Sequence, residues 1–311
     1  MTRIGVIGAT GAVGTVALEL LAERGFDDVR ALASARSEGK TVRYGDRELV
    51  VEEATPESLD GGLDLCFFSV GTAASRELVP YAVRGGAVCI DKSDAYRLVD
   101  GVPLVVAGVN DDVLDHDEII ANPNCSAIQL SCVLKPLAGA AGLARVRVAT
   151  YQSASGAGDA GIERLNATSP AEANLAMDWE LDGDEFSEEA KLRDETRKIL
   201  SLPDLPLQAN CVRVPVMVGH AQAVWVETTE PLSSGHAREV LSAAPHVRLA
   251  NLATPGEAAG ADDVLVGRIR RDPTVDNGFL LWTVCDNLRK GAALNAVQIA
   301  ELLLARRLLA A

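Results

Sequence analysis

The stretch Arg3-Ile-Gly-Val-Ile-Gly-Ala-Thr-Gly-Ala-Val-Gly14 decides the fold of the first part of the chain. Residues 4–7 are apolar and predict a short buried strand, and the pattern that continues through Leu21 predicts a helix. Three glycines lie between the two elements. They allow a tight turn and the close approach of a pyrophosphate, while the helix N-terminus offers N–H groups. This order predicts a dinucleotide site, with a plain tight turn as the alternative.

The next predicted strand, residues 29–33, indicates which dinucleotide would bind. An acidic residue at the end of this strand usually binds the ribose 2′-hydroxyl of NAD. Here the strand runs into Ser34-Ala-Arg-Ser37, and the first acid is Glu38. A guanidinium flanked by two hydroxyls suits a 2′-phosphate, so Arg36 and Ser37 favour NADP. The alternative for Arg36 is a solvated loop cation.

Strands and helices alternate up to residue 123. Apolar runs predict strands at residues 63–70, 87–90 and 102–109, and residues 76–83 predict a helix. Alternating elements of this kind form right-handed βαβ units around a parallel sheet. Small residues in Ser69-Val-Gly-Thr-Ala-Ala-Ser75, after the first of these strands, would again let a ligand approach the backbone. The fold predicted for this part is a Rossmann-type domain.

A cysteine lies where this pattern ends, in Asn122-Pro-Asn-Cys-Ser126. Pro123 fixes its own φ and disfavours helix at the preceding residue, whereas residues 125–134 predict a helix. Cys125 would then begin that helix, where the unpaired N–H groups favour an anionic sulfur and a lowered thiol pKa. The alternative is a cysteine that only packs.

The pattern changes in the second part of the chain. Strands are predicted at residues 145–151, 223–227, 246–252, 264–270 and 279–285, which suggests a mainly antiparallel sheet. Residues 160–200 are charged and mostly helical, and a last helix is predicted over residues 293–310. The whole chain is therefore expected to be α/β followed by an α+β domain.

Composition narrows the class of protein further. The formal net charge of -15 over 311 residues argues against a nucleic-acid partner. The six cysteines are scattered without a Cys-x-x-Cys pair, which predicts a reduced, cytoplasmic protein with no disulfide framework and no metal site. No apolar run is long enough to span a bilayer, so no membrane association is expected.

A reactive cysteine needs a base and groups that bind the substrate. His220 follows the segment Arg213-Val-Pro-Val216, and it is one of only four histidines. Gln152 and Arg213 could bind a carboxylate or carbonyl group. Arg97, Asn124 and Lys191 could form a phosphate pocket.

Together these motifs resemble the aspartate-semialdehyde dehydrogenase family. The matching segments occur in family order: Gly8-Ala-Thr-Gly-Ala-Val-Gly14, Ala33-Ser-Ala-Arg-Ser37, Asn122-Pro-Asn-Cys-Ser126, Tyr151-Gln-Ser-Ala-Ser-Gly-Ala-Gly158, Glu188-x-x-Lys191, Glu195-Thr-Arg-Lys198, Arg213-Val-Pro-Val216 with Gly219-His220, and Asp286-Asn-Leu-Arg-Lys-Gly-Ala-Ala293. The set covers almost the whole chain and is highly specific, although the glycine loop alone is not.

The resemblance implies the NADPH-dependent reductive dephosphorylation of L-4-aspartyl phosphate to L-aspartate 4-semialdehyde, a step toward lysine, threonine, methionine and diaminopimelate. It implies that Cys125 is the nucleophile that forms a thioacyl enzyme. The other implied roles are these: His220 is the general acid/base, Gln152 orients the acyl group, Arg213 binds the substrate carboxylate, Glu188 binds its ammonium group, and Arg97, Asn124 and Lys191 hold the phosphate.

The resemblance also implies an architecture. Residues 1–123 with 292–311 would form the NADP-binding Rossmann domain, to which the C-terminal helix returns. Residues 124–291 would form the catalytic and dimerisation domain of a homodimer. The residues expected to contact the cofactor are Gly8, Thr10, Gly11, Ala12, Val13, Gly14, Arg36, Ser37, Ser69, Gly71, Ser155, Gly156 and Asn287.

The chain departs from the family pattern in three places. Asp94 adds a carboxylate near the implied phosphate site, Ala107-Gly108 replaces a Pro-Glu pair, and residues 175–179 differ from the usual polar run. These departures keep open a paralogous acyl-phosphate reductase of a specialised pathway. A second alternative is a catalytically silent NADP-binding protein, whose signature would be the loss of Cys125 or His220, and both are present. N-acetyl-glutamyl-phosphate reductase is disfavoured by Asn124-Cys-Ser126, and a non-phosphorylating aldehyde dehydrogenase would not need the phosphate residues.

Overall fold

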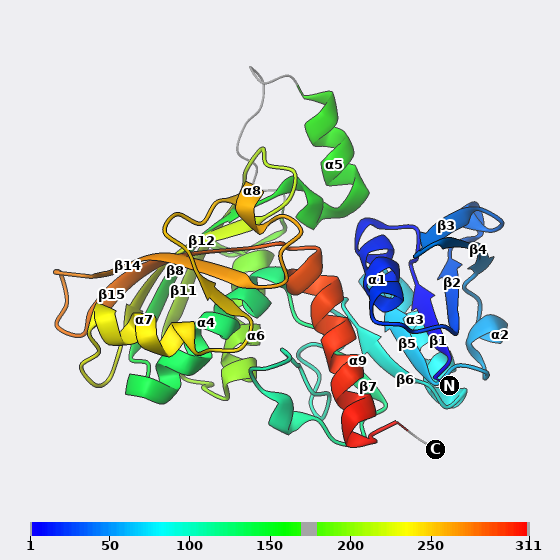
Figure 1. Ribbon diagram of the computed structural model, residues 1–311, viewed down its shortest axis with the longest axis horizontal. Helices are drawn as coiled ribbons and strands as arrows, with labels where there is room; N and C mark the ends of the chain where they lie inside the picture. The colour runs from blue at the N-terminus through cyan, green and yellow to red at the C-terminus, as the bar shows by residue number, and fades with distance from the viewer. Residues whose placement is uncertain (1, 169–178, 310–311) are drawn as a thin grey trace. The chain divides into compact units, whose positions relative to one another are not determined.

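A computed structural model describes residues 2–168 and 179–309, and the chain forms two compact units (Figure 1). The first unit contains Met1–Pro123 and Ala292–Ala311, and the second contains Asn124–Gly291. Of the departures noted in the sequence, residues 175–178 lie outside the described part. Within the described ranges, no helix is long and apolar enough to cross a membrane.

The first unit is built on a seven-stranded sheet with the order β3-β4-β2-β1-β5-β6-β7. All of its neighbouring pairs are parallel except β3–β4. The strands are β1 (Ile4–Ile7), β2 (Val29–Ala33), β3 (Thr41–Tyr44), β4 (Arg47–Glu53), β5 (Leu65–Phe68), β6 (Val88–Asp91) and β7 (Ile119–Ala121). This confirms the predicted Rossmann-type parallel sheet, since the strands are apolar and almost fully buried at its centre.

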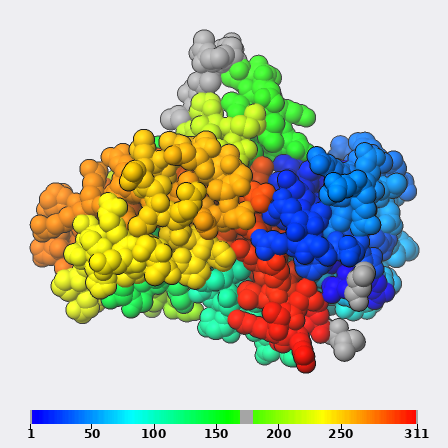
Figure 2. Space-filling model, viewed as in Figure 1, coloured from blue at the N-terminus to red at the C-terminus, as the bar shows by residue number. Residues whose placement is uncertain are grey.

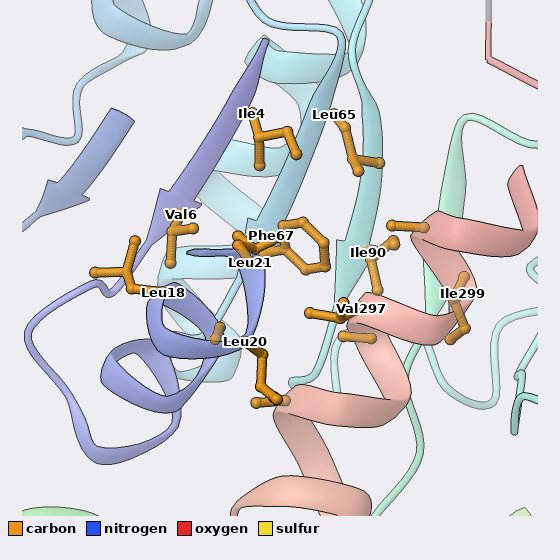
Figure 3. Close-up of a cluster of buried hydrophobic side chains, with 14 of the residues drawn as sticks. Ile4, Val6, Leu18, Leu20, Leu21, Leu65, Phe67, Ile90, Val297 and Ile299 are labelled. Atoms are coloured by element: carbon orange, nitrogen blue, oxygen red, sulfur yellow. The ribbon is translucent and has the colours of Figure 1, made fainter. Parts of the chain in front are cut away.

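Helices cover both faces of this sheet. They are α1 (Ala12–Glu23), α2 (Pro56–Leu59), α3 (Thr72–Arg84) and α9 (Leu294–Arg306). Figure 3 shows the core on one face, where Val6, Phe67 and Ile90 meet Leu21 of α1 and Val297 of α9. A second cluster includes Phe68, Val79 and Cys89. The C-terminal helix therefore returns to the first unit as expected, and its red atoms adjoin the blue N-terminal region in Figure 2.

The strand predicted at residues 102–109 is wrong. Only Leu104 forms a bridge, to Ala121, and β7 occupies the sheet edge instead. Pro103 has no N–H to donate to a ladder. The N–H of Ala107 donates to Oδ1 of Asn295, 3.0 Å away, and Gly108 turns with a φ of +82°. Side chains thus accept the N–H groups of Val106 and Ala107, which a strand would have paired with its neighbour.

The second unit contains a mixed six-stranded sheet with the order β11-β8-β12-β15-β14-β13. Its strands are β8 (Arg145–Gln152), β11 (Leu207–Arg213), β12 (His220–Glu227), β13 (Val247–Leu249), β14 (Val264–Arg271) and β15 (Gly278–Cys285), and a two-stranded ribbon joins β9 (Leu181–Asp182) and β10 (Glu185–Phe186). The three central pairings are antiparallel and the two edge pairings are parallel. The parallel edge strand β11 was not predicted.

The helices of the second unit are α4 (Cys125–Ala141), α5 (Gly158–Ala167), α6 (Ser187–Leu200), α7 (Ser234–Ser242) and α8 (Pro255–Ala258). In Figure 1, α4 and α7 lie side by side, and α4 also packs against α6. The ladder places Gln152 at the end of β8 opposite Arg213 at the end of β11, and His220 begins β12. The β8–β11 pairing therefore brings together candidate residues that are distant in sequence.

Candidate active site

The glycine loop of the first unit has the geometry of a pyrophosphate cradle. Gly8 has a φ of +87°, and a Cβ there would lie 2.3 Å from the Ser69 carbonyl oxygen. A Cβ on Gly14 would lie 2.1 Å from the Gly8 carbonyl oxygen. Gly11 caps α1, so Ala12 and Val13 contribute first-turn amides, which have no acceptor within a helix. These residues fit a dinucleotide phosphate.

The end of β2 lies beside this loop. Thr10 Oγ1 and Ser37 Oγ are 3.4 Å apart, and Arg36 is exposed in the same short turn, Ala35–Ser37. Ser69 donates its N–H to the Ile7 carbonyl at 2.8 Å, and Gly71 caps α3 with open space beside it. The structure thus brings the first-unit candidates for cofactor binding together at the carboxyl ends of β1, β2 and β5, the usual position for such ligands.

Cys125 is the first residue of α4, which confirms the position predicted for it. The Asn124 side chain caps the helix by accepting the Ser126 N–H at 2.8 Å, and the Asn124 N–H donates to Oε2 of Glu195 at 2.6 Å. A Cβ on Gly291 would lie 3.2 Å from the Cys125 Cβ, so the absence of a side chain at this position leaves room for the cysteine. The sulfur lies at a helix N-terminus, where a thiolate is favoured.

Cys125 is expected to be the one thiol that reacts in the native protein. It is half-buried, whereas the other five cysteines are buried. Burial also raises the pKa of Cys132 and raises that of Cys211 to about 12. Brief treatment with iodoacetamide followed by peptide mass spectrometry should find alkylation at Cys125. Alkylation of several cysteines before denaturation would contradict this prediction.

A buried carboxylate links the cysteine helix to β8. Oε1 of Glu188 accepts from Asn124 Nδ2 and from Gln152 Nε2, each at 2.9 Å. Lys191 follows three residues later on the same helix and is half-buried. Asn124, Gln152 and Glu188 therefore form one hydrogen-bonded group, and in this structure Glu188 orients the two amides.

His220 is completely buried at the start of β12. Its Nδ1 accepts the main-chain N–H of Ser153 at 3.0 Å and lies 3.0 Å from Oγ of the same serine. Nε2 is buried and has no hydrogen-bond partner in the described part of the chain. Gly156 leaves room for the ring, because a Cβ there would lie 2.9 Å from Nε2 and 3.1 Å from Nη1 of Arg213.

Arg213 and Asn287 both form hydrogen bonds with Ser153, the residue that contacts His220. Arg213 donates to the Ser153 carbonyl at 2.8 Å, and its guanidinium lies over the Trp179 ring, 4.9 Å from the centroid. Oδ1 of Asn287 accepts from Ser153 Oγ and from the Gly219 N–H, each at 2.9 Å, and its Nδ2 donates to Ser155 Oγ. Asn287, expected near the nicotinamide, thus also holds the segment around His220.

Acid should destabilise the protein through His220. Burial, then the charge of Arg213, lowers the pKa of His220 to about 3 from its ordinary 6.5. As the pH falls below 6.5, the unfolded chain takes up a proton that the folded protein does not, so stability is lost between these values. In His220→Gln, the fall in melting temperature from about pH 7 to about pH 4 should be smaller than in the wild type. The exposed His236→Gln should behave like the wild type.

Arg97, in the first unit, already has an anionic partner. Its Nη1 lies 3.0 Å from Oδ1 of Asp94, Nε donates to the Asn122 carbonyl at 3.1 Å, and Nη2 donates to the Lys92 carbonyl. The guanidinium is nearly buried, whereas Asp94 is largely exposed. The carboxylate that departs from the family pattern thus neutralises the arginine expected to bind phosphate.

The structure adds residues that sequence reasoning missed. Glu195 holds the Asn124 amide and Ser153 holds the imidazole. Both lie in segments that matched the family pattern, but only the folded chain shows their partners. Among the residues described, no cluster of three or more His, Cys, Asp or Glu side chains could hold a metal ion.

Comparison with known proteins identifies the family. Two family models match: semialdehyde dehydrogenase, NAD binding domain, over residues 3–116, and semialdehyde dehydrogenase, dimerisation domain, over residues 134–290. An aspartate-semialdehyde dehydrogenase of Corynebacterium glutamicum is 43% identical, covering 97% of this chain and 99% of the relative. Aspartate semialdehyde dehydrogenase II of Vibrio cholerae, solved in complex with ASA, is 39% identical with a TM-score of 0.92, covering 98% of each chain. The chain therefore belongs to the aspartate-semialdehyde dehydrogenase family.

Proposed function

We propose that this protein catalyses the reductive dephosphorylation of L-4-aspartyl phosphate to L-aspartate 4-semialdehyde, with release of phosphate. The family assignment supports the reaction class. The observation that carries the proposal is the half-buried Cys125 at the N-terminus of α4, in the unit that also holds His220, Gln152 and Arg213. The product belongs to the biosynthesis of lysine, threonine, methionine and diaminopimelate.

The first chemical step uses the cysteine. The Cys125 thiolate attacks the acyl carbon of the substrate, a C–S bond forms, and the C–O bond to phosphate breaks. A thioester then accepts hydride more readily than the carboxylate from which the substrate derives. Gln152 orients the acyl group, supported by its hydrogen bond to Glu188. His220 acts on the acyl oxygen through Nε2.

Charged residues recognise the rest of the substrate. Arg213 binds the α-carboxylate, as suits a buried guanidinium. Glu188 binds the ammonium group, and Arg97, Asn124 and Lys191 bind the phosphate. Since Asp94 pairs with Arg97, a paralogous acyl-phosphate reductase that acts on a different substrate is the second candidate.

The cofactor of this reaction is NADP, bound by the unit of residues 1–123 and 292–311, while residues 124–291 carry catalysis and dimerisation. When bound, a nicotinamide supplies the hydride. The exposed Arg36, beside Ser37 at the end of β2, supports NADP over NAD because no acid stands there. Ser155, Gly156 and Asn287 are proposed to contact the cofactor from the second unit.

Replacing Arg36 with alanine should weaken NADP binding by about 10- to 100-fold, since a charge-assisted hydrogen bond contributes about 1.5–3 kcal/mol. NAD affinity should change less than about twofold, because NAD lacks the 2′-phosphate. Titration of both cofactors by fluorescence would measure this. The matched control is Lys40→Ala, which removes an exposed cation nearby. Equal weakening by the two substitutions would indicate general electrostatics and no 2′-phosphate contact.

We also propose a homodimer formed through the second unit. Along β8, the residues alternate between buried and outward positions, and the outward Tyr151 is 38% exposed. Its ring lies 5.4 Å from that of Trp282, and Trp225 is half-buried on the neighbouring β12. Aromatic residues are enriched in protein interfaces.

The scattered free cysteines support a cytoplasmic location.

The reaction is best tested in reverse, with L-aspartate semialdehyde, NADP and phosphate, by following the absorbance of reduced cofactor. Phosphate-dependent reduction of NADP is expected. Oxidation of the aldehyde without phosphate would refute the phosphorylating reaction. Activity with other acyl phosphates but not with L-4-aspartyl phosphate would favour the paralogous reductase.

A further inference from the structure

The turn after β6 carries a charge pair that lies wholly within the first unit. Nη1 of Arg97 lies 3.0 Å from Oδ1 of Asp94, three residues earlier in the chain. The Arg97 side chain is only 9% exposed, whereas that of Asp94 is 42% exposed. A guanidinium this deeply buried needs a counter-ion, because an uncompensated buried charge is strongly destabilising. Asp94 supplies that counter-ion.

The other edge of the guanidinium is held by neutral groups. Nε donates to the Asn122 carbonyl at 3.1 Å, and Nη2 donates to the Lys92 carbonyl. These two main-chain contacts fix the direction of the side chain, so Nη1 marks the edge that faces an anion. Because Asp94 is the more exposed partner, a solute anion reaches the pair from the carboxylate side.

The turn also holds Asp94 in place. Asp91, fully buried at the end of β6, accepts from Ser75 Oγ and from Ser93 Oγ, each at 2.7 Å. Ser93 Oγ in turn accepts the Ala95 N–H at 3.1 Å, and Ala95 is buried. The residues on both sides of Asp94 are therefore anchored. Pairing costs less conformational entropy here than it does between two flexible surface side chains.

We propose that Asp94 sets the affinity of this protein for phosphate. Its carboxylate occupies the anion-facing edge of Arg97, and the phosphate group of the substrate binds there by displacing it. The use of Arg97 for phosphate rests on the proposed function, whereas the ion pair is a property of the folded chain alone. Asp94 is thus a specificity-determining residue that acts through Arg97.

This exchange of anions keeps the buried guanidinium neutralised in both states. When phosphate leaves, the Asp94 carboxylate has only a short way to return, since its main chain is anchored. While phosphate is bound, the displaced carboxylate stays close to it, and like charges at close range repel. Competition and repulsion both weaken phosphate binding, so both favour the release of phosphate after the thioester has formed.

Binding of inorganic phosphate tests the proposal without turnover. The melting temperature of the full-length protein is followed against phosphate concentration at constant ionic strength, with saturating NADP so that the glycine loop is already occupied. Asp94→Asn keeps the shape of the side chain and removes its charge. Its dissociation constant for phosphate should be about 5- to 30-fold lower than that of the wild type, since one competing ion pair and one nearby like charge are removed. Asp94→Ser should show the same gain.

Asp100→Asn is the matched control, because it removes an exposed acid between β6 and β7 and changes the net charge equally. Its dissociation constant for phosphate should stay within about twofold of the wild type, since solvent and salt screen an exposed charge. The double variant with Asp94→Asn and Arg97→Gln should lose the gain, because the effect requires the guanidinium. A gain that is absent in Asp94→Asn, equal in Asp100→Asn or retained in the double variant would overturn the proposal.

Kinetics separate the role of Asp94 from the proposed reaction. In the reverse direction, Asp94→Asn should lower the KM for phosphate and leave the KM values for L-aspartate semialdehyde and NADP within about twofold. Equal changes in all three KM values would show a general structural effect and overturn the proposal. Turnover with an unchanged KM for phosphate would refute the role of Asp94 and keep the reaction. Tighter phosphate binding by Asp94→Asn without turnover of the semialdehyde would support the role and refute the reaction.

Discussion

Replacing Cys125 with alanine is expected to lower kcat by about 10⁴-fold or more, because no other group in the site would form the thioester. The fold should survive, since the helix cap is made by the Asn124 side chain and the Ser126 amide and not by the sulfur. Initial rates of the phosphate-dependent reverse reaction would measure the loss. Cofactor binding and melting temperature should remain close to those of the wild type.

Cys132→Ala is the matched control on the same helix. Cys132 is almost fully buried, so its loss should lower the melting temperature while kcat stays within a few-fold. If Cys125→Ala kept substantial activity, or if Cys132→Ala lost as much, the assignment of the nucleophile would be wrong.

Replacing Gly14 with alanine is expected to disrupt the first unit. The new Cβ would lie 2.1 Å from the Gly8 carbonyl oxygen and 2.8 Å from its carbon, so β1 and α1 would have to separate. A loss of about 3 kcal/mol follows from overpacking of this kind. The melting temperature should fall by roughly 5–10 °C, and NADP binding should be lost. Calorimetry and fluorescence titration would measure the two effects.

Gly11→Ala provides the comparison within the same loop. A Cβ at this position would lie 3.5 Å from the Gly8 carbonyl oxygen, an ordinary contact, and Gly11 has a negative φ. Its melting temperature should therefore remain within a few degrees of the wild type. Similar destabilisation by both substitutions would show that close packing at Gly14 is not what the loop requires.

Local sequence determined a large part of this protein. The glycine loop between β1 and α1 and the position of Cys125 at the start of α4 were predicted correctly, because each depends on neighbouring residues. The spacing of apolar residues and the position of proline identify such elements without tertiary contacts. The family itself was identified from motifs whose residue order is a property of the sequence.

Tertiary structure decided what the sequence left open. Residues 102–109 are apolar enough for a strand, but Pro103 and the Asn295 side chain, 188 residues beyond Ala107, set a different conformation. The sequence offers both Lys92 and Arg97 as partners for Asp94, and the folded chain places Nη1 of Arg97 3.0 Å from its carboxylate. The hydrogen bond of the Ser153 N–H to Nδ1 of His220, 67 residues later, likewise forms only where β8 and β12 meet. A sequence specifies which groups donate and accept, but protonation and pairing depend on distances that exist only once strands from different segments are packed together.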